Sequence, residues 1–280
     1  MTFIRYIPSP PLNAYVNCLY YLDGRMPYTR ERIFPLPSLD LKINFGGAVQ
    51  VHEPDHPKRT TAFNESWCVG VWSECHAVNW PLDMQIFGVN LKPVGAYMLF
   101  NLPLYELHNQ VVTLDTLWGH FATEVRERLY AAMTTQARFA LLEQLLLARL
   151  HDIPHNFNFA QYGTAQIARY QGTLSIRSLS DELGISQMSL AKLFKQMVGA
   201  LPKELARLHR FECVLRSIDL AQPVDWTRIA HQCGYYDQAH FIKDFAMFTG
   251  SSPTDYLRLR RQICAENPEH NQLYRNLPIV

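Results

Sequence analysis

One layout occurs twice in the C-terminal half of the chain, in SIRSLSDELGISQMSLAKLFKQMVG (residues 175–199) and in VDWTRIAHQCGYYDQAHFIKDFAMFTG (residues 224–250). Each stretch predicts a short helix, a glycine, a brief turn, a second helix and a closing glycine. Gly184 and Gly234 stand where the turn needs a positive φ, which glycine adopts most readily. The sequence therefore predicts two helix-turn-helix units in tandem.

The second helix of each unit combines an apolar stripe with a polar face. Ser186 and Asp237 are its predicted N-caps. Residues at helical spacing are predicted to face the core, namely Leu190, Leu193, Phe194 and Met197 in one unit and Phe241, Phe245 and Phe248 in the other. The predicted DNA-binding residues lie on the remaining faces: Gln187, Met188, Ala191, Lys192, Lys195, Gln238, Ala239, His240 and Lys243.

These exposed side chains are of types that read a major groove. Gln pairs with adenine, Lys with guanine or phosphate, and Ala or Met contacts thymine methyl groups. A single unit of this kind is explained equally well as an ordinary solvated helix, but two at one spacing favour DNA binding. A connecting helix over residues 202–220 would span on the order of 28 Å, and successive major-groove faces lie about 34 Å apart.

The end of this region, GYYDQAHFIKDFAMFTGSSPTDYLRLRR (residues 234–261), closely resembles the signature of AraC/XylS transcriptional regulators. The resemblance covers about residues 161–261 and implies a seven-helix domain with two recognition helices. It assigns base contacts to Met188, Ala191, Lys192, Gln238, Ala239 and Lys243. Lysine stands at 192 and 243 where the family more often has arginine, so two-pronged reading of guanine is less assured. Because Met188 and Ala191 offer no hydrogen bond, the first helix is expected to read shape or thymine methyl groups.

The N-terminal part reads as strands. In DLKINF (residues 40–45), apolar and polar residues alternate, which predicts a half-buried strand, and IFGVNLKP (residues 86–93) predicts another. The stretches RIFPLPSLDLKINFGG (residues 32–47) and FGVNLKPVGAYMLFNLPLYELHNQVVTLDTLWG (residues 87–119) resemble the cupin-like effector domains of the same family. The expected fold is α+β: a cupin-like β-barrel, a helical pair, and an all-α double helix-turn-helix domain.

The predicted boundaries are 1–115 for the barrel, 116–150 for the helical pair, 151–160 for a linker, 161–262 for the DNA-binding domain and 263–280 for a tail. Six leucines between positions 141 and 150 exceed what one helix face needs against its own barrel. We expect the helical pair to form a homodimer interface. Packing of this surplus on the DNA-binding domain is the alternative.

Charge divides the 280-residue chain unevenly. Residues 1–160 hold 12 Lys/Arg and 14 Asp/Glu, whereas residues 161–262 hold 13 and 9, which suits a polyanionic partner only mildly. We expect a cytoplasmic protein, because no secretory signal or membrane span is evident. The six cysteines contain no C-x-x-C pair and are expected to be reduced thiols.

Catalytic motifs are not evident, and we expect neither an enzyme nor a cofactor. His52 and His56, in VHEPDHP, are predicted to lie in a surface turn and not to bind a metal. No basic neighbour in sequence marks Cys68 or Cys75 as a reactive thiol. Trp67, Trp72 and Trp80 are the candidate effector pocket, with ordinary core packing as the alternative.

The prediction is a sequence-specific DNA-binding transcriptional regulator controlled by a small molecule in its N-terminal domain. Its expected partners are double-stranded promoter DNA, RNA polymerase, an effector and a second copy of the chain, with no membrane contact. Two alternatives stay open: a ligand-independent regulator whose barrel only dimerises, and a cupin-type enzyme fused to a DNA-binding module.

Overall fold

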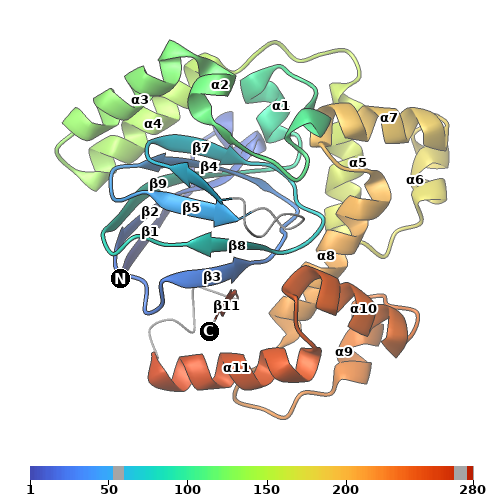
Figure 1. The fold of residues 1–280 in the computed structure, drawn as a ribbon. Coiled ribbons are helices and arrows are strands. Elements are labelled where there is room, and N and C mark those ends of the chain that lie inside the picture. The colour runs from blue at the N-terminus through green and yellow to red at the C-terminus, as the bar shows by residue number, and fades with distance from the viewer. Residues whose placement is uncertain (53–59, 268–275, 280) are drawn as a thin grey trace.

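The computed structural model describes residues 1–52, 60–267 and 276–279. Strands dominate its N-terminal half and helices dominate the rest (Figure 1). The mixed α+β class is as predicted. No helix among the described residues is long and apolar enough to cross a membrane.

Two antiparallel sheets build the N-terminal domain. The six-stranded sheet has the order β1 (Thr2–Tyr6), β2 (Val16–Gly24), β9 (Met84–Leu91), β4 (Leu39–Asn44), β7 (Ser66–Val69) and β10 (Val111–Thr113). The five-stranded sheet has the order β11 (Leu277–Pro278), β3 (Arg30–Ile33), β8 (His76–Asn79), β5 (Val49–His52) and β6 (Thr60–Phe63). His52 therefore ends a strand, whereas the sequence suggested a turn. His56 lies outside the described residues.

In the described part of the chain these sheets do not close into the single barrel that the sequence suggested. Large side chains such as Tyr20, Trp67 and Met84 form a hydrophobic cluster between them. Sheets that pack through their side chains lie about 10 Å apart, which is roughly twice the spacing of hydrogen-bonded strands. Strands that face each other across this space therefore cannot form backbone hydrogen bonds. The result is two facing sheets with side chains and space between them.

The six-stranded sheet is buried on both faces. Along β2, Leu19 and Tyr21 belong to the main core, while Tyr20 and Leu22 belong to the cluster between the sheets. Three helices cover the other face: α2 (Leu114–Trp118), α3 (His120–Ala131) and α4 (Thr135–Arg149) (Figure 1). Phe139 of α4 has its ring centroid 5.4 Å from those of both Tyr6 and Phe87.

The leucines of α4 are satisfied within the chain, which overturns the reasoning that led to a dimer interface. Leu142, Leu145 and Leu146 are buried, and the other three, at positions 141, 147 and 150, are partly buried against the same core. The helix packs on a sheet and on the short helix η1 (Leu12–Ala14), so a broad apolar face is needed. No leucine surplus is left to require a partner.

The predicted linker, residues 151–160, is partly helical and anchored. The backbone N–H of His151 donates to the carbonyl oxygen of Met98, in α1 (Gly95–Phe100), at 3.0 Å. Helix α5 (Phe157–Arg169) starts inside the predicted linker. The Phe157 ring is buried, with its centroid 6.1 Å from that of Tyr15. Phe157 is a core residue, and this docking fixes the connection.

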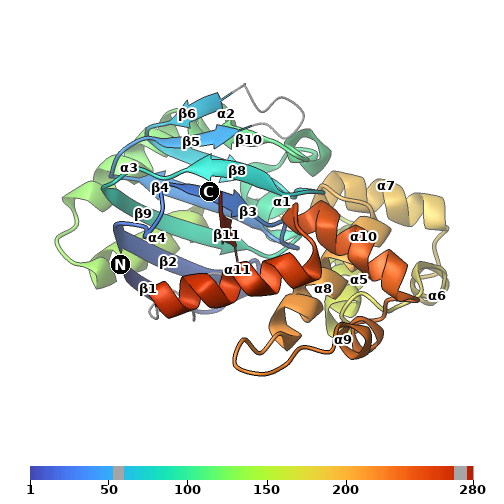
Figure 2. The same cartoon turned by 60° about the horizontal axis from the view of Figure 1, so that its bottom comes forward.

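The C-terminal part of the described chain contains the seven helices that the family resemblance implies. After α5 they are α6 (Ile176–Glu182), α7 (Gln187–Val198), α8 (Pro202–Ser217), α9 (Trp226–Gln232), α10 (Gln238–Thr249) and α11 (Pro253–Glu266). The predicted tail is not separate: α11 continues to Glu266, and Leu277 and Pro278 pair with β3 (Figure 2).

Strand β3 and the residues after it join the sheets to the C-terminal helices. Arg32 donates from Nη1 to the carbonyl oxygens of Thr249 and Gly250, at 3.0 and 3.2 Å. The Phe34 ring lies 6.1 Å from Phe211 of α8 and 5.9 Å from Tyr256 of α11, between ring centroids. At the other end, a Cβ on Gly199 would lie 2.7 Å from the carbonyl oxygen of Leu104, which begins η2 (Leu104–Leu107). The two halves are packed directly on each other.

Candidate functional site

The turns of both helix-turn-helix units have the predicted local geometry. Gly184 and Gly234 adopt φ values of +66° and +76°. The side chain of Ser186 accepts from the backbone N–H of Ser189 at 3.0 Å. Asp237 likewise accepts from the backbone N–H of His240 at 2.7 Å. These caps start α7 and α10, which are therefore the candidate recognition helices.

The apolar stripe of each recognition helix is buried and leaves the opposite face open. Leu190 and Phe194 on α7 are fully buried, as are Phe241 and Phe245 on α10. Most of the predicted DNA-binding side chains are exposed: Gln187, Met188, Lys192, Lys195, Gln238, Ala239 and Lys243. The three lysines form no ion pair with any described residue, so their charges are available to a polyanion.

Ala191 and His240 are only partly exposed. The His240 ring packs edge-on against Tyr235, and its Nε2 lies 3.7 Å from Oδ2 of Asp244. This imidazole is turned toward its own helix. Tyr236, which is not among the DNA-binding residues predicted from the sequence, is 94% exposed in the turn before α10. A large aromatic side chain in a turn between helices is the signal that could have found it.

Helix α8 connects the two units and is tied to α10 by an ion pair. Arg207 donates from Nη2 and Nε to the Asp244 carboxylate, at 2.7 and 3.3 Å. Hydrogen bonding to Asp244, which is nearly fully buried, raises the pKa of Arg207 above its usual value. The Arg207 guanidinium is therefore engaged within the protein, and we assign it a structural role.

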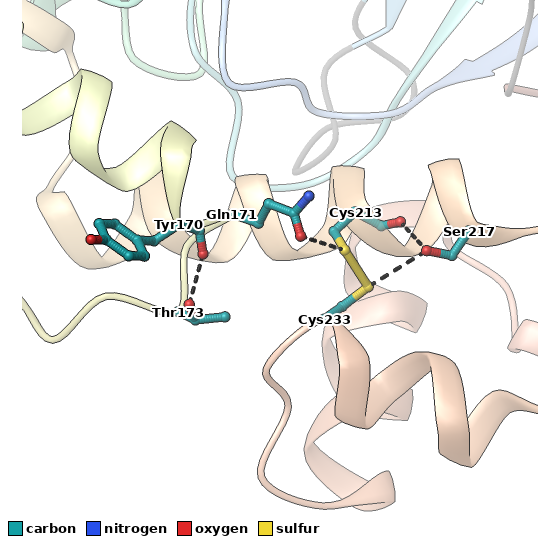
Figure 3. The surroundings of a disulfide bond; sticks show 6 residues. All are labelled: Tyr170, Gln171, Thr173, Cys213, Ser217 and Cys233. Atoms are coloured by element: carbon teal, nitrogen blue, oxygen red, sulfur yellow. Dashed lines mark hydrogen bonds between the residues drawn. A yellow bond between two sulfur atoms is a disulfide. The ribbon is translucent and has the colours of Figure 1, made fainter.

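A disulfide also joins the second unit to α8. Cys213 on α8 and Cys233 at the end of α9 are bonded, with their Cα atoms 5.8 Å apart (Figure 3). The Oε1 atom of Gln171 lies 3.3 Å from the Cys213 sulfur. The expectation of six reduced thiols is therefore wrong for this pair. The two cysteines lie 20 residues apart on different helices, so no spacing motif reveals them.

A cavity of about 460 Å³ lies between the two sheets and reaches α8. Trp67, Trp72 and Trp80 all line it, so the structure brings the three predicted pocket residues together. Their role in effector binding stays a prediction. Other apolar lining side chains include Leu22, Met26, Val51, Val78 and Met84, whereas Glu212, Leu215 and Arg216 of α8 line the side toward the C-terminal helices.

Four polar side chains in this cavity were not predicted as site residues. Tyr28 Oη and Trp80 Nε1 donate to the fully buried Glu31, each at 2.8 Å, and burial raises the Glu31 pKa to about 7. Burial lowers the pKa of His76 to about 3, so its imidazole is neutral near pH 7. Lys42 pairs with Asp40, whose Oδ2 also accepts from Tyr20 Oη at 2.6 Å.

Asp40 and Lys42 show why the sequence missed this site. They alternate with Leu41 and Ile43 on β4, and that pattern predicts a face in contact with water. The polar face instead lines the space between the sheets. The useful signal was a carboxylate and an ammonium two residues apart on the inner face of a central strand.

The other candidate chemistry gives no site. Among the described residues no three His, Cys, Asp or Glu side chains are grouped so that they could hold a metal ion. His52 is hydrogen-bonded to Asn79 and Thr60, at 3.0 and 3.1 Å. Burial raises the thiol pKa values of Cys68 and Cys75, which disfavours the reactive thiolate.

Comparison with known families divides the chain in the same two parts. A family of helix-turn-helix domains matches residues 179–259, and a domain of unknown function (DUF6597) matches residues 4–113. The first match covers both helix-turn-helix units except for the start of α6. A search of curated proteins found no match to the sequence.

Solved structures of ToxT from Vibrio cholerae are similar at 12% sequence identity. ToxT from strain O395 has a TM-score of 0.46, with 85% of this chain and 97% of that chain covered. The same protein bound to (E)-4-(8-methylnaphthalen-1-yl)but-3-enoic acid gives 0.46, with 92% and 99% covered. ToxT from strain SCE256 with a bound unsaturated fatty acid gives 0.43, with 91% and 94% covered. Both acids are ligands of ToxT.

Proposed function

We propose that this chain, which carries an AraC-type helix-turn-helix domain and is a DNA-binding transcriptional regulator, is controlled by a small molecule bound between the sheets of its N-terminal domain. The observation that carries the DNA-binding part is the pair of capped recognition helices, α7 and α10, with exposed polar faces. In this proposal Gln238, Lys192 and Lys243 contact bases, and Lys195 contacts phosphate.

The cavity supports ligand control because α8 forms part of its lining. Glu212, Leu215 and Arg216 lie on the helix that connects the two DNA-reading units. A ligand that touches these side chains contacts the element that sets the distance and angle between α7 and α10. Such a ligand shifts DNA affinity only if it binds the DNA-competent and DNA-incompetent arrangements unequally.

The remaining partners are part of the proposal. We propose that the chain acts on double-stranded promoter DNA as a homodimer, works with RNA polymerase, is not an enzyme and resides in the cytoplasm. A dimer through α3 and α4 would have to use outward-facing residues of these helices, such as Tyr130 and Ala140, and of the turn between them, such as Met133. The leucines are buried or partly buried against the chain's own core.

DNA binding by the full chain tests the proposal. DNA fragments selected from a random library are titrated with three proteins: the wild type, the double variant Lys192→Ala plus Lys243→Ala, and Arg25→Ala. Arg25→Ala is the control, because it removes an exposed cation that lies far from both recognition helices in sequence. The double variant should lose at least ~10-fold affinity for the selected site, and the control should not. Equal losses would contradict the assignment of DNA binding to α7 and α10.

Ligand control is tested separately. Compounds that co-purify with the chain are identified by mass spectrometry and added back during the DNA titration. A change in DNA affinity supports control by a ligand. If no compound is found and no change is seen, the ligand-independent regulator that only dimerises is favoured. A stoichiometric metal in the purified chain, together with turnover of the co-purified compound, would favour the cupin-type enzyme.

A further inference from the structure

The cavity between the sheets contains polar atoms that have no partner among the residues that the structure describes. Trp72 Nε1, His76 Nδ1 and Asp40 Oδ1 are buried and form no hydrogen bond with any residue in 1–52, 60–267 or 276–279. The Trp72 and His76 side chains stack, with ring centroids 4.1 Å apart, and each residue is 5% exposed. Buried polar atoms without partners are costly, so a cavity that collects three of them is suited to a ligand that supplies the missing hydrogen bonds.

The three atoms specify what the ligand must offer. Trp72 Nε1 can only donate a hydrogen bond, and the Asp40 carboxylate oxygen can only accept one. The neutral His76 ring can do either, depending on its tautomer. The rest of the lining is mainly apolar and aromatic, including Trp67, Trp80 and Phe34. The matching molecule therefore has a flat apolar body with both a donor and an acceptor.

The cations that line the cavity are already paired with carboxylates. Lys42 pairs with Asp40, and Arg216 Nη2 lies 2.6 Å from Oε1 of Glu212. Lys42 and Arg216 are the two Lys or Arg side chains among the described lining residues, where Glu31 is a third carboxyl group and has no lining cation of its own. A ligand carboxylate would therefore have to displace an internal ion pair.

We propose that this cavity binds an uncharged aromatic molecule whose hydrogen-bond donor pairs with Asp40 Oδ1 and whose acceptor pairs with Trp72 Nε1. The inference rests on the proposed ligand control, and it adds the chemical class of the ligand. An anionic ligand is excluded because buried charge without a counter-charge is strongly disfavoured. A cationic ligand is disfavoured at Asp40, which Lys42 already neutralises, and at Glu31, whose carboxyl group accepts hydrogen bonds from Tyr28 and Trp80.

Three probes with one body and different charge test this class directly. They are 2-naphthamide, which has a donor and an acceptor but no charge, 2-naphthoate, and 2-naphthylmethylammonium. Binding to the full chain is measured by calorimetry. Wild type should bind 2-naphthamide at least ~10-fold more tightly than either charged probe. Tighter binding of either charged probe, or no binding of 2-naphthamide at millimolar concentration, overturns the proposal.

Variants locate the binding in this cavity. Asp40→Asn releases Lys42 from its carboxylate, so the preference for 2-naphthamide over 2-naphthoate should fall by at least ~10-fold. Asp83→Asn removes an exposed carboxylate outside the cavity lining and should leave the preference unchanged. Trp72→Phe keeps a ring but removes the N–H, and should weaken 2-naphthamide binding ~5–10-fold.

Using both Asp40→Asn and Trp72→Phe protects the test against misfolding of either variant. Thermal unfolding checks each protein, and Trp72→Phe still decides the outcome if Asp40→Asn does not fold. An unchanged preference in folded Asp40→Asn, or unchanged affinity in Trp72→Phe, contradicts the proposal. DNA titrations are run in parallel with 2-naphthamide. If 2-naphthamide binds but does not change DNA affinity, the result counts against ligand control. If the chain does not prefer 2-naphthamide over the charged probes, the result counts against the proposed ligand class.

Discussion

Removing the guanidinium of Arg207 tests how the second recognition helix is held. The nearly fully buried Asp244 carboxylate accepts two hydrogen bonds from Arg207, at 2.7 and 3.3 Å. Arg207→Ala leaves that charge unpaired, which costs about 3–5 kcal/mol in a fully buried pair. The Arg207 side chain is 34% exposed, so water screens the pair and we expect a loss of about 2–3 kcal/mol.

Urea denaturation followed by circular dichroism measures this loss. The double variant Arg207→Ala plus Asp244→Ala removes both charges and should recover about half of the lost free energy of unfolding. A change below about 0.5 kcal/mol in Arg207→Ala would refute the reasoning. DNA titration over a salt series adds an independent check. If Arg207 contacted a phosphate, Arg207→Ala would make the slope of log K against log salt less steep by about 0.9. If Arg207 only forms a structural ion pair, the slope stays unchanged.

Three further predictions concern recognition, the disulfide and the buried carboxyl group. Gln238→Ala should reduce the free energy of binding to the cognate DNA site by about 1–3 kcal/mol and relax the preference at one base pair. Lys195→Ala should weaken binding to all DNA sequences alike. If Gln238→Ala also weakened every sequence equally, base reading by Gln238 would be contradicted. Cys213→Ser should lower the free energy of unfolding by roughly 3 kcal/mol under oxidising conditions, because the loop between Cys213 and Cys233 is no longer closed, and by little with dithiothreitol present. Glu31 has its pKa raised by burial to about 7, so it stabilises the fold below its unfolded pKa near 4.5 and loses this contribution as pH rises through 7. Urea titrations should therefore show Glu31→Gln gaining stability relative to wild type between pH 4.5 and 8, and a constant difference would count against that pKa.

The DNA-binding half could be predicted because its signals are local. A glycine in the turn, a cap such as Ser186 and a stripe such as Phe241 and Phe245 each depend on neighbours within one or two helical turns. The bonds across that domain could not be predicted. Arg207 and Asp244 lie 37 residues apart, and their pairing depends on how α8 and α10 pack.

The cavity was only partly predictable, because alternation along a strand does not say what the polar face meets. The three tryptophans suggested a pocket by their nature and closeness in sequence, and they do share one. Asp40 and Lys42 looked like surface residues because the pattern cannot distinguish water from a second sheet. The leucines of α4 misled in the opposite direction, since the breadth of a sheet face is not visible in the helix that covers it.

The most direct test of the central claim is a methylation-protection experiment on DNA selected by the full chain. If α7 and α10 each read one major-groove segment, each bound chain should protect two clusters on one face of the duplex, about 10 base pairs apart. Gln238→Ala should weaken only the cluster read by α10, and Lys192→Ala only the cluster read by α7. A single protected segment, or loss of both clusters in each variant, would contradict two independent recognition helices.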